Sequence, residues 1–241
     1  MAPIAGGVCS VCGERVLSAR IAGTISQDQI RCGLCQRIEP PFERAAAYGS
    51  YEGTLRDLIH LLKYSSVRPA ADVLGQMLAS AAAKLGSRFA DGKIAVIPVP
   101  LFRGKLRQRE FNHAQLIAAA AVKISRGRLH LDPGLLERKR ETVSQTGLTR
   151  HQRRENVRGA FVVTQPEAVN GREVLIVDDV FTTGATVSEC ARVLRRAGAA
   201  RVWVATVART LSFAEPKFEF QPASTDAESE QGIVLAQASG I

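Results

Sequence analysis

The stretch of residues 174–186 constrains the fold more than any other part of the chain. It opens with four apolar, mostly β-branched residues, which predict a strand buried on both faces. Asp178 and Asp179 follow, and we expect them to end that strand. Thr-Thr-Gly-Ala-Thr comes next at 182–186, and an apolar pattern of helical period continues to Gly198, where we expect the helix to end. This order predicts an α/β fold with a polar loop at one sheet edge.

The same order indicates a phosphate site. A helix N-terminus carries unpaired N–H groups and a partial positive charge, and a Thr/Gly loop lets backbone amides approach an anion. Asp178 and Asp179 repel phosphate, but they can accept hydrogen bonds from sugar hydroxyls or hold Mg²⁺ directly or through water. A sugar phosphate satisfies both parts. The alternative is a plain turn in which Thr182, Thr183 or Thr186 caps the helix, which leaves the acid pair unexplained. No G-x-x-x-x-G-K-[ST] occurs, so this is not the loop of nucleotide triphosphatases.

Two Cys-x-x-Cys pairs near the N-terminus predict a metal site. They are Cys9 with Cys12 and Cys32 with Cys35, separated by 19 residues. Two such knuckles supply four thiolates for a tetrahedral Zn²⁺, and a closed set of four ligands indicates a structural rather than a catalytic metal. Two disulfides and a redox-active pair are the weaker alternatives. We expect Cys190, on the helix after 186, to be a packed apolar residue.

The length of 241 residues allows one α/β domain with a small appendage. No run of 18 apolar residues occurs, and the first nine residues lack a basic stretch followed by an apolar one. We therefore expect no membrane-spanning helix, no secretory signal and a cytoplasmic location. The Pro40-Pro41 pair predicts a boundary between a zinc knuckle, 1–41, and an α/β unit, 42–211. Residues 212–241 are polar, and we expect a partly disordered tail.

Charge is unevenly distributed along the chain. The net charge is +9, but residues 212–241 carry −4 and the remainder +13. Between Arg103 and Arg158 there are 14 lysines and arginines against 5 acids. This basic band suits a polyphosphate or a nucleic-acid backbone, although a solvated basic face explains any single residue equally well.

Periodicity predicts the remaining elements of the α/β unit. We expect strands at 45–51, 94–100, 161–163 and 200–208, and helices at 54–64, 70–85 and 111–124. Asn170-Gly171 is typical of a hairpin-like turn. The prolines of the strand at 94–100 belong at its carboxyl end, where ligands bind in open α/β sheets. Lys63 could reach a phosphate, but a cation favoured by the helix dipole is the better interpretation.

Two basic segments are candidates for contacts to a polyphosphate. A loop directly after the strand at 94–100 would face the acid pair and hold pyrophosphate with Arg103, Lys105, Arg107 and Arg109. The polar segment 137–156 is predicted to be a mobile excursion with some helix. It could act as a lid that closes with Arg138, Lys139 or Arg140, and a disordered insertion is the alternative.

The stretch at 174–186 resembles the phosphoribosyl pyrophosphate (PRPP) signature of the type I phosphoribosyltransferases over its full length. The resemblance implies that the 5-phosphate lies on the loop and the ribose diol on the two acids, which would be the catalytic carboxylates. It assigns PRPP binding to Asp178, Asp179, Val180, Phe181, Thr182, Thr183, Gly184, Ala185 and Thr186.

The order of all motifs is similar to that of the competence protein F (ComF) family. The matching parts are the four-cysteine knuckle, Pro98-Val99-Pro100-Leu101, Arg109-Glu110-Phe111-Asn112, residues 145–161 with the pattern Q-x-x-L-x(4)-R-x-x-N-x-x-x-A-F, and residues 178–186. The resemblance covers residues 9–210. The family tends to have Arg-Gly-Phe-Asn-Gln where this chain has Glu110 and His113. A glutamate in an anion loop has the wrong charge, which weakens the assignment of pyrophosphate to Arg109.

The resemblance implies a type I phosphoribosyltransferase-like parallel sheet flanked by helices, in a protein linked to DNA uptake or utilisation. Implied partners are single-stranded DNA and helicase or recombination proteins, and a homo-oligomer stays open. Two functions agree with these features: a pentosyl transferase that uses PRPP with Mg²⁺, and a non-catalytic module on the same fold that binds single-stranded DNA or has a regulatory role. The sequence offers no obvious acceptor-activating base: His113 and His151 are candidates, but a lone histidine is more often a surface or hydrogen-bonded structural residue.

Overall fold

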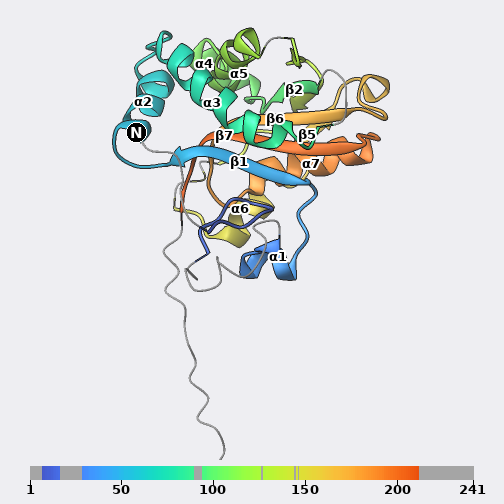
Figure 1. The fold of residues 1–241 in the computed structure, drawn as a ribbon. Helices are drawn as coiled ribbons and strands as arrows, with labels where there is room; N and C mark the ends of the chain where they lie inside the picture. The colour runs from blue at the N-terminus through green and yellow to red at the C-terminus, as the bar shows by residue number, and fades with distance from the viewer. Residues whose placement is uncertain are drawn as a thin grey trace, which may run out of the picture.

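A parallel five-stranded sheet forms the centre of the protein. The computed structural model describes residues 7–16, 29–89, 94–125, 127–143, 145 and 147–211, so the tail predicted at 212–241 lies outside the described residues. The strand order is β1-β7-β6-β2-β3, and every neighbouring pair is parallel (Figure 1). This confirms the predicted fold class. The strands are β1 (Arg44–Ser50), β2 (Ile94–Pro98), β3 (Leu129–Leu131), β6 (Glu173–Phe181) and β7 (Arg201–Arg209).

One face of the sheet is covered by helices from the first half of the chain. They are α2 (Gly53–Tyr64), α3 (Ala70–Gly86) and α5 (His113–Ile124), with the short α4 (Arg103–Arg109) beside them (Figure 1). In α2, Leu55, Ile59 and Leu62 recur at helical spacing and are buried in the core under these helices. The helices α3 and α5 approach each other closely, because a side chain on Gly75 would lie 2.4 Å from the Cβ of Ala120.

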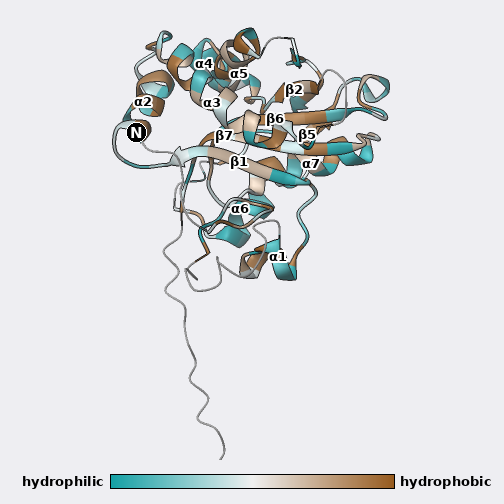
Figure 2. Ribbon diagram, viewed as in Figure 1, coloured by the Kyte–Doolittle hydropathy of each residue, from teal (hydrophilic) through white to brown (hydrophobic). Residues whose placement is uncertain are grey.

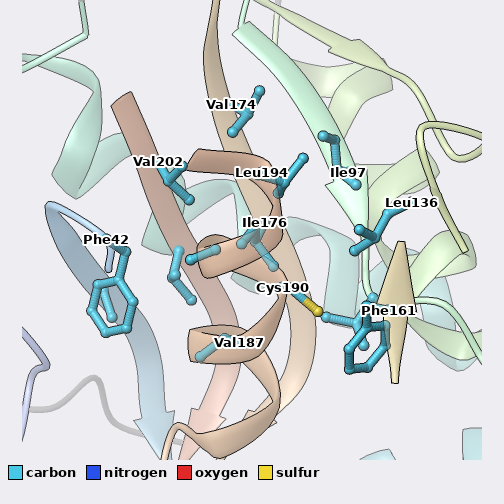
Figure 3. Close-up of a cluster of buried hydrophobic side chains, with 14 of the residues drawn as sticks. Phe42, Ile97, Leu136, Phe161, Val174, Ile176, Val187, Cys190, Leu194 and Val202 are labelled. Carbon is cyan, nitrogen blue, oxygen red and sulfur yellow. The ribbon is translucent and has the colours of Figure 1, made fainter. Parts of the chain in front are cut away.

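The opposite face carries α7 (Ala185–Arg196), α6 (Arg150–Val157) and α1 (Gly33–Arg37), together with the cysteine segment. Side chains of α7 point into the second core, where Val187, Cys190 and Leu194 meet Ile176 of β6 and Ile97 of β2 (Figure 3). Cys190 is fully buried, in line with its predicted packing role. Strands β2 and β6 are among the most hydrophobic parts of the chain and α6 among the most hydrophilic (Figure 2).

Two short strands form a separate antiparallel sheet. They are β4 (Leu136–Arg138) and β5 (Phe161–Val163), and a 3₁₀ turn (Pro166–Ala168) follows β5. The strand predicted at 161–163 therefore exists but does not join the main sheet. The hairpin predicted at Asn170-Gly171 is wrong, because the strands on either side of it belong to different sheets. The strands β3 and β4 and the helix α4 were not predicted, since each has too few residues to show a period.

The expectation that the acid pair ends its strand is also wrong. Strand β6 runs on to Phe181, with Asp178 paired to Thr206 and Val180 to Ala208 of β7. The ladder continues because β7 is equally long and extends to Arg209. None of the helices in the described part of the chain has the length and hydropathy needed to cross a membrane.

Candidate functional site

The acid pair lies in a gap that prolines leave in the sheet. Strand β2 pairs with β6 from Ala95 to Pro98, whose partner is Val177. Pro98 and Pro100 have no N–H group to donate; β2 ends at Pro98, and the N–H of Val99 donates one further bond to the carbonyl of Val177 at 2.8 Å. From Asp178 onward, β7 is the only strand in the described chain that pairs with β6. The two carboxylates therefore stand at the carboxyl end of the sheet, where β2 no longer covers them.

Asp179 is buried and lies against the ammonium of Lys63 and the ring of His113. Its side chain is 6% exposed, its Oδ2 contacts the ammonium of Lys63 at the end of α2, and Nε2 of His113 lies 3.2 Å from the same oxygen. Burial by itself would raise the pKa of Asp179, but Lys63 and His113 outweigh it and lower the pKa to about 2. Burial opposes the charge of Lys63 in turn, yet Asp179 keeps the pKa of Lys63 above its ordinary value. Asp179 is therefore an ionised carboxylate held by an ion pair.

Asp178 has the opposite character. Burial and the neighbouring charge of Asp179 raise the pKa of Asp178 to about 8. Its Oδ1 accepts a hydrogen bond from the backbone N–H of Asp179 at 2.9 Å. In the ligand-free protein Asp178 therefore holds a proton at neutral pH while Asp179 does not. A cation or sugar hydroxyl placed between them would change this balance, because it supplies the partner that Asp178 lacks.

A buried chain of polar contacts links the acids to the basic helix. His113 is 6% exposed, and burial lowers its pKa to about 4, so its ring is neutral at pH 7. Nε2 faces Asp179, and Nδ1 lies 3.4 Å from a guanidinium nitrogen of Arg109. That guanidinium covers the ring of Tyr64 at 5.2 Å. Both ring nitrogens of His113 thus have partners, which argues against a role as acceptor-activating base.

Lys63 and His113 both contact Asp179, a role that the sequence did not predict for either residue. Lys63 is more than a cation at a helix end, because its partner is a carboxylate on a distant strand. No local pattern could show this. For His113 a local signal existed: Asn112 caps α5 by accepting from the N–H of Ala114 and Gln115, which fixes where the next side chain points.

The predicted phosphate loop, residues 182–186, connects β6 to α7. Gly184 has a φ of 77°, which favours glycine, and it directly precedes α7. A Cβ there would lie 2.6 Å from Cζ of Phe181, so the loop sits tightly on that ring. The N–H of Ala185 points to Oγ1 of Thr183 at 3.4 Å. The loop thus joins the acid-bearing end of β6 to the N-terminus of α7, and its role in binding phosphate stays a prediction.

The predicted lid reaches this loop. Nε2 of Gln145 donates to Oγ1 of Thr186 at 2.9 Å, and the segment continues into α6, which begins with a capping box formed by Thr149 and Gln152. Arg140 donates to the backbone carbonyls of Asn156 and Arg158, at 2.9 and 2.8 Å.

Arg138 is engaged in the same segment. It contacts Thr142 and covers the ring of Phe161 at 5.4 Å. Arg138 and Arg140 therefore hold the excursion together. Their predicted lid role, with Lys139, stays a prediction.

The basic segment after β2 is a helix, not the loop that was predicted. Phe102 begins α4 in an extended conformation, and no proline follows to prevent helix formation. Arg103 donates to Glu137 at 2.8 Å, and Lys105 and Arg107 are at least partly exposed. Of the predicted pyrophosphate ligands, Arg109 is the one linked to the acids, through His113.

The four cysteines form a cluster. The Sγ atoms of Cys9, Cys12, Cys32 and Cys35 all lie within 4.8 Å of one another, and Cys12 and Cys32 are 3.6 Å apart. A tetrahedral Zn²⁺ with bonds of about 2.3 Å requires sulfur separations of about 3.8 Å, so the cluster is compatible with zinc. The cysteine segment is anchored to the sheet, because the N–H of Ala45 in β1 donates to the carbonyl of Val11 at 2.7 Å.

A groove of about 920 Å³ separates the cysteine segment and α1 from α6 and the start of α7. Thr183, Gly184 and Ala185 of the predicted phosphate loop are among its lining residues. Its walls carry eight arginines and four glutamates, so they are basic overall. The arginines are Arg15, Arg31, Arg37, Arg150, Arg154, Arg158, Arg192 and Arg209. The sequence predicts the basic band but not this groove, because the walls of the groove come from segments that are distant in the sequence.

Comparison with known proteins agrees with this geometry. Residues 114–226 match the model of the phosphoribosyl transferase domain. The DNA utilization protein YhgH of Escherichia coli O157:H7 is 35% identical over 216 residues, which cover 85% of this chain and 91% of that protein. This chain belongs to the competence protein F family. Competence protein F of Haemophilus influenzae is 30% identical over 214 residues, 84% of this chain and 90% of that protein.

The family assignment agrees with the cysteine cluster and the parallel sheet described above. Among solved structures, the allosteric regulatory enzyme of purine biosynthesis aligns with 58% of this chain and 26% of its own, at 26% identity and a TM-score of 0.35. The chain thus carries a phosphoribosyltransferase-type domain with four clustered cysteines at its N-terminal side.

Proposed function

We propose that this protein binds PRPP with Mg²⁺ and transfers its ribose 5-phosphate in a process of DNA utilisation. The observation that carries the proposal is the meeting of three features at one sheet edge. These are the acid pair, the glycine-containing loop before α7, and the gap that Pro98 leaves beside them. A phosphate on the loop and a diol on the acids would use all three. The names of the relatives support the DNA-related part.

The carboxylates fit a hard divalent cation. Asp178 and Asp179 offer oxygen atoms within 4.8 Å of each other and of a ring nitrogen of His113, and oxygen ligands are what Mg²⁺ prefers. Bound Mg²⁺ would offset the negative charge that develops on departing pyrophosphate. The role of the chain itself is to orient the ribose: the loop amides hold the 5-phosphate, and ionised Asp179 accepts a hydrogen bond from a ribose hydroxyl.

In the transfer itself, the bond from ribose C1 to the pyrophosphate oxygen breaks with its electron pair going to that oxygen. A new bond forms from the acceptor to C1. The centre resembles an oxocarbenium ion, so Asp179 at the diol also stabilises developing positive charge. Arg109 is the cation that the structure connects to this edge, and we assign it to pyrophosphate ahead of Arg103, Lys105 and Arg107.

Calorimetric titration with PRPP and Mg²⁺ tests the proposal. The wild type is expected to bind in the micromolar range, and the double variant Asp178→Asn with Asp179→Asn is expected to lose binding. The matched control is Asp132→Asn, which removes a carboxylate that is ion-paired to Arg172 beside β3, away from the loop. Wild-type protein that binds no PRPP, or a double variant that binds it normally, would refute the assignment.

The four cysteines are proposed to hold a structural Zn²⁺. The donor set is closed, with four thiols and no fifth group at the cluster among the described residues, so it offers no position for substrate. Elemental analysis of purified protein is expected to give one zinc per chain. Protein that is folded and free of zinc would contradict this.

A second candidate function is binding of single-stranded DNA, which the arginine groove favours. Arg150 and Arg154 are four residues apart and lie on one face of α6, Arg158 is the residue directly after the helix, and all three line the groove. Such a row suits the regularly spaced phosphates of a strand. Few aromatic side chains line the groove, so phosphate contacts rather than base stacking would dominate.

Fluorescence anisotropy with a labelled single-stranded oligonucleotide tests this candidate. Replacing these three arginines with glutamine is expected to weaken binding and to reduce the slope of log K against log salt by about 2, since each contact on a single strand contributes about 0.7. The control variant replaces Arg103, Lys105 and Arg107 of α4, which removes the same charge elsewhere. Equal effects of both variants would indicate general charge attraction and would exclude the groove as the site.

A further inference from the structure

Arg209 connects the cysteine cluster to the rest of the protein. It is the last residue of β7 and is 4% exposed. Its Nη2 donates to Oε2 of Glu14 at 2.9 Å and lies 3.7 Å from Sγ of Cys12. The centre of its guanidinium group is 4.3 Å from the centroid of the Phe181 ring. One buried side chain thus touches a metal-ligand candidate on one side and the end of β6 on the other.

Phe181 in turn shapes the phosphate loop. It is 5% exposed and meets Phe42 edge to face at 6.3 Å. Gly184 packs so closely on the ring that any side chain at that position would overlap it. The backbone carbonyl of Phe181 accepts from the N–H of Thr210, which ties it to the residue after Arg209. A shift of the Phe181 ring must therefore move the turn that presents the loop amides.

Charge explains why Arg209 depends on the metal. A Zn²⁺ ion with four thiolates carries a net charge of −2, and a buried anionic centre is stabilised by a neighbouring guanidinium. Nε and Nη1 of Arg209 are buried without a hydrogen-bond partner among the described residues. The group therefore relies on Glu14, the sulfur and the Phe181 ring. Without the anionic zinc–thiolate centre, Glu14 is the carboxylate that Arg209 still contacts, together with the Phe181 ring.

We propose that Arg209 is a positioning residue that couples metal binding at the four cysteines to the shape of the phosphate loop, residues 182–186. Metal binding then strengthens phosphate binding, and phosphate binding strengthens metal retention by the same factor. The inference rests on the proposed function only in treating this loop as the phosphate site. The zinc unit is, on this view, part of the ligand site through Arg209 and Phe181 rather than an independent appendage.

Hydrogen exchange read by mass spectrometry tests the coupling without any sugar ligand. Removal of zinc from the wild type with a chelator is expected to raise exchange of amides 182–186 about fivefold or more, while β2 stays protected. Zinc-loaded Arg209→Met is expected to show the raised exchange already. It should also release zinc to a chromophoric chelator about 10- to 100-fold faster than the wild type.

The control is Arg201→Met, on the same strand. Arg201 is ion-paired to Glu173 and lies over Trp203 at 5.9 Å, at the far end of β7 from the cysteines. Both readouts should match the wild type. If Arg209→Met does not fold, Phe181→Leu takes its place: it keeps the contact to Cys12, so zinc release should be unchanged while the loop no longer responds to chelation.

Two results would overturn the coupling. The first is a loop in zinc-loaded Arg209→Met whose amides exchange no faster than those of the wild type. The second is an equal rise in hydrogen exchange in β2 and in the loop on chelation, which would mean that the metal stabilises the whole domain. Failure of the wild type to bind PRPP with Mg²⁺ would refute the proposed function, yet the exchange and zinc-release measurements would still decide the role of Arg209.

Discussion

The ammonium of Lys63, in the last turn of α2, contacts the buried carboxylate of Asp179 on β6. His113 approaches the same oxygen, so one carboxylate holds together three elements that are distant in sequence. For its neighbour Asp178, burial and the charge of Asp179 outweigh the attraction of Lys63 and raise the pKa to about 8. The two adjacent acids of the signature therefore play different electrostatic roles before any ligand arrives.

Replacing the two acids one at a time should change stability in opposite directions. The folded pKa of Asp179 lies below its unfolded value, so its ionised form stabilises the fold above about pH 4, and that contribution is lost as the pH falls towards 2. Asp179→Asn leaves Lys63 buried without its carboxylate and should cost about 3 kcal/mol at pH 7. Urea unfolding measures this. A loss no larger than that of Asp132→Asn would contradict it.

For Asp178 the expected effects of pH and of substitution on stability have the opposite sign. Its folded pKa is raised, so stability is greatest below about pH 4 and falls as the pH rises towards 8. Asp178→Asn removes this penalty and should stabilise the ligand-free protein on the order of 1 kcal/mol at pH 7, with a smaller gain at pH 4. Thermal unfolding of both proteins across this range is the measurement. A gain that does not grow with pH would show that the carboxyl group is not the cause.

A double-mutant cycle should isolate the Lys63–Asp179 pair. Lys63→Met alone leaves the buried carboxylate uncompensated except for His113, and we expect a loss of about 3 kcal/mol. The combination with Asp179→Asn should lose clearly less than the sum of the single changes, because neither charge is then left alone. Strict additivity would mean that the pair contributes nothing.

Glu110 sits in a conformation that suits glycine. Its φ is 64°, at the end of α4, and its side chain is exposed with a carboxylate oxygen 3.9 Å from Arg68. Glu110→Gly should therefore stabilise the protein by about 1 kcal/mol. Glu110→Ala is the matched control, since it removes the charge but keeps the strain, and should give no such gain. Equal stabilisation by both changes would assign the effect to charge.

A side chain at position 184 should disturb the loop and weaken ligand binding, whereas a side chain at position 171 should not. Both have positive φ, but only Gly184 packs against Phe181, whereas a Cβ on Gly171 would meet nothing within 4 Å. Gly184→Ala is expected to weaken binding of PRPP with Mg²⁺ at least tenfold, which corresponds to about 1.4 kcal/mol. Gly171→Ala should leave binding unchanged in the same calorimetric assay. Similar binding by both variants would remove the loop from the site.

Removing one cysteine ligand should release the metal. Cys32→Ser is expected to abolish zinc binding and destabilise the cysteine segment, measured by elemental analysis and thermal unfolding. Cys190→Ser is the control, because that thiol is fully buried in the core beside α7 and away from the cluster. It should retain zinc while losing some stability. Loss of zinc in both variants would point to general unfolding instead.

The sequence by itself determined the features that depend on neighbours along the chain. Four β-branched and apolar residues, the acid pair and Thr-Thr-Gly-Ala-Thr defined β6, its loop and the start of α7, because period and turn chemistry are local. The two Cys-x-x-Cys pairs indicated one cluster, since their equal spacing already presents four thiolates. Prolines correctly marked the end of β2.

The tertiary structure alone decided which side chains meet. The strand continued past Asp178 because β7 happens to be long enough to pair with it. Lys63 contacts Asp179, and Arg209 contacts Cys12 and Phe181. These residues lie on elements distant in the sequence, so no local sequence pattern predicts that they meet. Burial then split the pKa values of two neighbouring aspartates, because the cost of a charge depends on the partners that the fold brings to it.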